Sequence, residues 1–150
     1  MINMILIRIE VEVRPTEDVG KVKKALLNLF TIKRDDIKIV DLDNEYKLLV
    51  IEKRNLSPLF KFHDLLRQER ILDSARNVLL NSRSGNIITF KLHKQSAYVG
   101  HISFVSYDDE SPLGPITVTI TSDKINEIID WLAPKTKAGK PLWEKEVPKV

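Results

Sequence analysis

The sequence predicts an α+β domain with a predominantly antiparallel sheet and helices packed on one face of it. Residues 5–14 alternate between apolar and mostly charged side chains, other segments have helical apolar stripes, and short polar turns join several strand-like runs. A period of two with one charged face is typical of a strand buried on one side only, as in antiparallel sheets. We expect the other face of the sheet to be solvated, unless a second subunit covers it.

The first predicted strand ends at Pro15, and a helix is expected to follow it. Thr16 is the expected N-cap, with Glu17 and Asp18 in the first turn, where the helix dipole favours acidic side chains. The buried stripe of this helix comprises Val19, Val22, Leu26, Leu29 and Phe30.

The rest of the chain predicts a hairpin, further helices and three more strands. Helical periodicity runs from residue 59 to 80, and Glu69 interrupts it, so two helices meeting near residues 68–71 are an alternative to one. Ser122 is the expected N-cap of a last helix that ends before Pro134. The hairpin is expected at residues 37–51 and the strands at residues 87–92, 99–107 and 116–121, with an exposed loop at residues 108–112.

The length of 150 residues is typical of one domain. We expect residues 1–134 to form it and residues 135–150, which contain several lysines and two prolines, to form an extended tail. The N-terminal apolar run becomes charged at Arg8, too soon for a signal peptide, and no later segment has membrane-spanning length. A cytoplasmic protein without a membrane partner is therefore expected.

The middle of the chain is its most basic part. The net charge of the whole chain is +3, and residues 56–100 contribute seven basic and three acidic side chains. A polyanion is expected to meet this part first, although a solvated helix face is an alternative explanation of so small a bias.

Polar side chains are concentrated between residues 92 and 104. Bases stack on aromatic rings, and phosphates accept hydrogen bonds from lysine, hydroxyl and amide groups, so this segment suits single-stranded or looped RNA. We interpret it as a strand–turn–strand element, and its alternative is a hydrated hairpin connection with Tyr98 in the core. The predicted RNA contacts are Lys94, Gln95, Ser96 and Tyr98, with electrostatic support from Arg67 and Arg70.

The sequence contains no recognisable catalytic constellation, so a non-enzymatic protein without a cofactor is expected. Cysteine is absent, the five glycines are too widely spaced for a phosphate-binding loop, and no serine lies in a G-x-S-x-G motif. The three histidines lack metal-ligand spacing, so no metal site is expected. An enzyme would require Glu12, His101 or the carboxylates of residues 108–110 to converge in one pocket.

Several motifs, in order along nearly the whole chain, resemble those of archaeal uncharacterised protein family 0201. The resemblance implies RNA binding, no established catalytic residues, and a fold like that of the large-subunit ribosomal protein that contacts the small ribosomal RNA. One small departure is Ser96, where the family prefers alanine. The motifs are RPTED at residues 14–18, LRQERILDSAR at 66–76, KQSAYVG at 94–100, LGPI at 113–116 and DWLAP at 130–134.

A non-enzymatic RNA-binding or ribosome-associated protein is thus the leading hypothesis. The alternative is a self-associating scaffold or protein-interaction module, for instance a homodimer, that docks through the sheet face or through the tail with Trp143.

Overall fold

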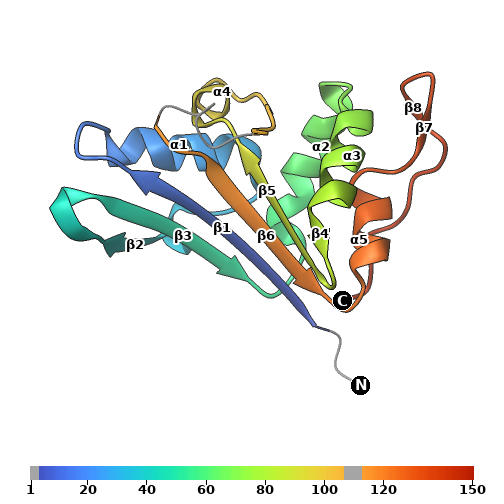
Figure 1. Ribbon diagram of the computed structural model, residues 1–150, viewed down its shortest axis with the longest axis horizontal. Helices are drawn as coiled ribbons and strands as arrows, with labels where there is room; N and C mark the ends of the chain where they lie inside the picture. Colours follow the sequence, from blue (N-terminus) through green and yellow to red (C-terminus); the bar gives the residue numbers. More distant parts are fainter. Residues whose placement is uncertain (1–3, 107–112) are drawn as a thin grey trace.

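A six-stranded antiparallel sheet, covered by helices on one side, forms the body of the protein (Figure 1). The computed structural model describes residues 4–106 and 113–150. The strand order is β2-β3-β1-β6-β5-β4, and every pairing is antiparallel, which confirms the predicted α+β class. The strands are β1 (Ile5–Val13), β2 (Lys38–Asp41), β3 (Lys47–Lys53), β4 (Arg83–Ser84), β5 (Ile87–Leu92) and β6 (Ile116–Ser122). The helices are α1 (Val19–Leu29), α2 (Phe60–Gln68), α3 (Leu72–Ser82), α4 (Lys94–Tyr98) and α5 (Ile125–Leu132).

Strand β1 is central because its alternation gives it one fully apolar face. Its odd-numbered residues from Ile5 to Val13 are all buried, and its even-numbered residues are half-buried on the other face. It pairs with β3 on one side and with β6 on the other. The two strands that flank β1 therefore come from distant parts of the sequence, residues 47–53 and 116–122, and Figure 1 shows the β1 and β6 arrows side by side.

The core lies between this apolar sheet face and the helices. Phe62 of α2 is at its centre, with its ring stacked 5.7 Å from that of Phe30 and 5.5 Å from that of Phe90. Burying one such side chain contributes about 1.5–3 kcal/mol. The aromatic cluster therefore fixes α2 on the sheet.

The opposite face of the sheet is largely polar. One row across it runs from Glu52 through Arg8 and Thr119 to Thr89, over four neighbouring strands. The Arg8 guanidinium pairs with the carboxylates of Glu52 and Glu10. No helix is needed to cover such a face, in keeping with the alternation from which it was predicted.

The first helix begins two residues later than expected. Asp18, not Thr16, is the N-cap, and its carboxylate accepts a hydrogen bond of 2.7 Å from the Gly20 amide. Glu17 turns back instead and accepts a hydrogen bond from the Arg14 amide. The expectation for Thr16 was wrong because an aspartate two positions on competes effectively for the same role.

The long helical stretch divides into α2 and α3, as the two-helix alternative predicted. The break falls at residues 69–71, where Arg70 has a φ of 56°. The Ile71 amide donates to the carbonyl oxygen of Leu66, which closes the end of α2. Residue 70 thus redirects the chain by a left-handed conformation.

The strand expected at residues 99–107 is absent from the described part of that range. Only an isolated bridge joins Leu92 and Phe104, flanked by a hydrogen bond from the His93 amide to the Ser103 carbonyl. The residues before it fold into α4 instead. Tyr107 and the predicted loop at residues 108–112 lie outside the described residues.

The tail contains a small hairpin and returns to the body of the protein. Its strands are β7 (Thr136–Lys137) and β8 (Lys140–Pro141), and Figure 1 shows them beside the upper ends of α2 and α3. Further along, Glu144 pairs with Arg67, and Val150 packs against the core. In the part of the chain that the structure describes, no helix is both long and apolar enough to cross a membrane.

Candidate nucleic-acid interface

Helix α4 replaces the predicted turn and gives the candidate segment its shape. The helix has five residues and starts at Lys94, directly after the extended residue His93. Its carbonyl end is capped from α1, because Asn28 Nδ2 donates to the carbonyl oxygens of Ala97 and Tyr98 at 3.0 and 3.2 Å. Gly100, with a φ of 79°, turns the chain away. The strand–turn–strand interpretation was wrong because these contacts with α1 favour a helical turn.

Lys94 is completely buried, so its ammonium group does not face solvent. The Nζ atom donates to the Glu17 carboxylate at 3.0 and 3.1 Å and to the carbonyl oxygens of Glu12 and Leu113 at 2.8 and 2.6 Å. Burial lowers the pKa of Lys94, and the Glu17 carboxylate opposes that shift. A direct contact between Lys94 and RNA does not fit this geometry.

Tyr98 lies beside the same carboxylate and is half-buried. Its hydroxyl donates to Glu17 Oε2 at 3.3 Å. Burial, together with the negative charge of Glu17, raises the pKa of Tyr98 to about 12. The phenol is therefore a neutral hydrogen-bond donor, and Lys94 and Tyr98 together hold Glu17 in place.

The remaining residues of the segment are more accessible. Gln95 is exposed and Ser96 is half-buried, while Val99, directly after the helix, has 71% of its surface exposed. Of the four contacts predicted in this segment, Lys94 therefore faces inward, and the other three are at least partly exposed to solvent. Only Gln95, Ser96 and Tyr98 remain available to a partner.

Two lysines of α1 lie beside these residues and were missed in the sequence. Lys21 and Lys24 are exposed and, with Tyr98, line a hollow of about 560 Å³. Glu17 and Asp18 line it too, but the first pairs with Lys94 and the second caps α1. The charge balance of residues 1–55 hid these lysines, because acidic side chains on the strands and turns offset them in the sum.

The guanidinium group of Arg67 is engaged in hydrogen bonds within the protein. It donates to the carbonyl oxygens of His63, Leu132 and Trp131 and forms a bidentate pair with Glu144 at 2.7 and 2.8 Å. This hydrogen-bonded pair lowers the pKa of Glu144. Arg67 thus joins α2, α5 and the tail.

Arg70 is exposed at the end of α2, and neighbouring Glu69 connects that end to the segment after α4. The Glu69 carboxylate accepts hydrogen bonds from the Ile102 amide at 3.2 Å and lies 3.4 Å from His101 Nδ1. Glu69 therefore joins the end of α2, where Arg70 lies, to the segment that follows α4.

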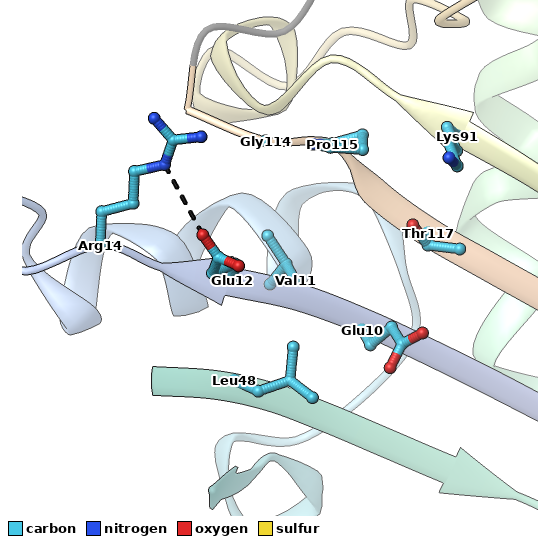
Figure 2. A pocket seen from close by; sticks show the side chains of 9 residues that line it. All are labelled: Glu10, Val11, Glu12, Arg14, Leu48, Lys91, Gly114, Pro115 and Thr117. Carbon is cyan, nitrogen blue, oxygen red and sulfur yellow. Dashed lines mark ion pairs between the residues drawn. The ribbon is translucent and has the colours of Figure 1, made fainter. Parts of the chain in front are cut away.

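A second hollow, on the open face of the sheet, has a different character (Figure 2). It has a volume of about 410 Å³, and Lys91, Thr117 and Glu10 line it from neighbouring strands. Figure 2 also shows Arg14 paired with Glu12, at 3.6 Å. The two carboxylates and the two cations in its lining balance each other in charge. The hollow between α1 and α4 has the same balance in its lining, but there the buried ammonium group of Lys94 also pairs with Glu17 and leaves an excess of positive charge.

The carboxylates and histidines weighed for an enzyme are separated. Glu12 lies in the hollow of Figure 2, whereas His101 lies next to Glu69, directly after α2, and residues 108–110 are outside the described residues. Among residues 4–106 and 113–150, no group of three or more histidine, aspartate and glutamate side chains could hold a metal ion.

Comparisons with known proteins agree with one another. A family model described as RNA binding matches residues 6–122. The chain is 52% identical over 145 residues to a UPF0201 protein of Sulfurisphaera tokodaii, with 97% of this chain and 98% of that protein covered. It is 46% identical over 145 residues to a UPF0201 protein of Metallosphaera sedula, with 97% and 99% covered.

A solved structure shows the same fold. The crystal structure of a UPF0201 protein from Methanococcus jannaschii matches with a TM-score of 0.76 and 36% identity, covering 91% of this chain and 98% of that one. The sheet, its one-sided helices and the α1–α4 surface define a small α+β protein with a candidate surface for an anionic partner. The chain belongs to the UPF0201 family, which confirms the resemblance seen in its motifs.

Proposed function

We propose that this protein binds single-stranded or looped RNA, without catalysing a reaction on it, on the surface formed by α1 and α4. The observation that supports the proposal is the hollow in which Tyr98 lies beside the exposed lysines Lys21 and Lys24. Lysines attract phosphates, and an aromatic ring with neighbouring amide and hydroxyl groups suits unstacked bases. The family model described as RNA binding also supports it.

In this proposal Lys94 has a supporting role. Its buried ammonium group neutralises Glu17, which would otherwise repel phosphate in the hollow. Gln95 and Ser96 are the remaining contacts on α4, and Asn28 holds the helix that presents them. The proposal includes a cytoplasmic location and an association with ribosomes, where structured RNA is abundant.

The test is RNA binding measured over a range of salt concentrations. RNA recovered with the protein from cell extract is sequenced, and affinity for a mixed-sequence single-stranded RNA is then measured. The double variant K21Q/K24Q should bind more weakly and reduce the slope of log affinity against log salt by about 0.7 for each phosphate that the variant no longer neutralises.

The matched control is R34Q/K38Q, which removes two exposed cations from the segment between α1 and β3. It should leave the slope nearer the wild-type value than K21Q/K24Q does. Absent or salt-independent RNA binding by the wild-type protein would refute the proposed function.

A second candidate function is self-association, as in a homodimer. Strand β2 lies at the edge of the sheet, and its residues Ile39 and Val40 are 46 and 45% exposed, with Leu42, directly after it, 41% exposed. An exposed apolar edge strand is a template for pairing with another chain. Light scattering should then report a dimer for the wild-type protein and a monomer for V40K, and a monomeric wild-type protein would eliminate this candidate.

A further inference from the structure

A hollow of about 310 Å³ lies between the corner joining α2 and α3 and the hairpin of the tail. Arg67, Arg70 and Lys140 line it, and among residues 4–106 and 113–150 no acidic residue does. The remaining lining residues, Leu72, Ala138, Gly139 and Pro141, carry no charge. It is therefore a basic site formed by segments about 70 residues apart in the sequence.

Backbone conformation brings the two exposed cations together. Arg70 occupies the left-handed position, with a φ of 56°, at the end of α2. Across the hollow, Ala138 and Gly139 have φ values of 54° and 78° and form the two-residue turn that precedes Lys140. Such turns match the twist of a hairpin, which gives Lys140 a defined place next to the corner.

The hairpin is attached to the helices at several points. The Thr136 hydroxyl pairs with the Asp73 carboxylate of α3. Within the tail itself, the Leu142 amide donates to the Lys135 carbonyl at 2.8 Å and closes the base of the hairpin. The Arg67–Glu144 pair holds the chain beyond β8. These contacts pre-organise the hollow, so little ordering is required when a ligand binds.

The carboxylates near the hollow already have hydrogen-bond or ion-pair partners within the protein. Asp73 is bonded to Thr136, Glu144 to Arg67, and Glu69 to the Ile102 amide. Within the described part of the chain, the side chains of Arg70 and Lys140 form no hydrogen bond or ion pair. Two cations without an ion-pair partner in the described part of the chain therefore line the same hollow, together with the ion-paired Arg67.

We propose that this hollow binds a phosphate group of an RNA backbone, with Arg70 and Lys140 as its direct contacts. Arginine presents a planar fork of donors that fits phosphate oxygens, and lysine adds a compact charge. The inference rests on the proposed function, since Glu69 links this corner to the segment after α4. RNA bound at α1 and α4 would extend across the end of α2 to the tail.

Two titrations followed by NMR test the site. One uses a mixed-sequence single-stranded RNA and the other inorganic phosphate. Both should shift the backbone amides of Ala138 and Gly139 and the Nε–H of Arg70, and R70Q/K140Q should abolish these shifts. The double variant should also bind RNA about tenfold more weakly. This loss corresponds to about 1.4 kcal/mol of binding free energy, close to the contribution of one hydrogen bond to a charged group.

The control R34Q/K38Q removes the same charge elsewhere and should bind RNA more tightly than R70Q/K140Q does. If R70Q/K140Q matches this control and RNA causes no shifts at Arg70, Ala138 or Gly139, the site is refuted while the proposed function stands. If phosphate shifts these groups but RNA does not bind, the phosphate site stands, and RNA as its source is refuted together with the proposed function. If neither probe shifts these groups, the site is refuted.

Discussion

The Nζ atom of Lys94 lies 3.0 Å from Oε1 of Glu17, although 77 residues separate the two in the sequence. Their side chains are 0 and 5% exposed. Through this pair the start of α4 is fastened to the turn before α1, and two carbonyl oxygens complete the coordination of the ammonium group. The most prominent lysine of the candidate segment thus organises the surface without being part of it.

Removing one partner of this pair should destabilise the fold. K94M leaves the Glu17 carboxylate buried without its cation, which is expected to cost about 3–5 kcal/mol. Urea denaturation measures the free energy of unfolding. The double variant K94M/E17Q should be more stable than K94M alone, and a K94M protein as stable as the wild type would contradict the structural role.

The phenol of Tyr98 should lose its proton at a higher pH than an ordinary tyrosine does. Its pKa in the folded state is about 12, against 10 for an ordinary tyrosine, because of burial and the neighbouring Glu17. Since the folded state holds this proton more tightly, the stabilisation is complete below pH 10 and is lost as the pH rises toward 12. Ultraviolet titration of phenolate absorbance should show a late step that Y98F removes and E17Q moves to lower pH.

Asn28 should be necessary for a stable α4. In N28A the carbonyl oxygens of Ala97 and Tyr98 lose their donor, and the expected decrease is about 1–3 kcal/mol of unfolding free energy. N77A, on the exposed side of α3, is the matched control and should stay within about 0.5 kcal/mol of the wild type. Equal stability of the two variants would refute the capping role.

Acid should release the tail. Arg67 lowers the pKa of Glu144, so the stabilisation by this pair is present above the usual glutamate pKa and is lost as the pH falls through the folded-state value. Hydrogen exchange of residues 142–150, corrected for the intrinsic effect of pH, should accelerate on acidification. E144Q should show the fast exchange already at neutral pH, and slow exchange in that variant would argue against the pair as the anchor.

The regular elements were predictable because local pattern determines them. The alternation in β1 has the period of 2 residues that strand geometry imposes, and the apolar stripe of α1 has the period of 3.6 residues of a helix. The interruption at Glu69 even indicated the break between α2 and α3. Errors occurred where a local choice was nearly balanced, as between Thr16 and Asp18 for the cap of α1.

The candidate site was predicted only in part. Its location on residues 94–98 was inferred from donor-rich composition, but composition does not distinguish an inward-facing lysine from an outward-facing one. Lys94 is buried because Glu17, Glu12 and Leu113 supply its partners, and all three are distant in sequence. Lys21, Lys24 and Lys140 were overlooked for the same reason, since only folding brings them beside Tyr98 or Arg70.

The sequence by itself determined the α+β class, the one-sided sheet and the family to which the chain belongs, because these follow from short-range periodicity and motifs. Only the tertiary structure decided that residues 94–98 form a helix, that Lys94 neutralises a buried glutamate, and that Arg70 meets Lys140 across a basic hollow. The physical reason is the distance along the sequence over which the deciding contacts act. A side chain's burial and charge partners depend on segments that approach it only after the sheet and helices have packed.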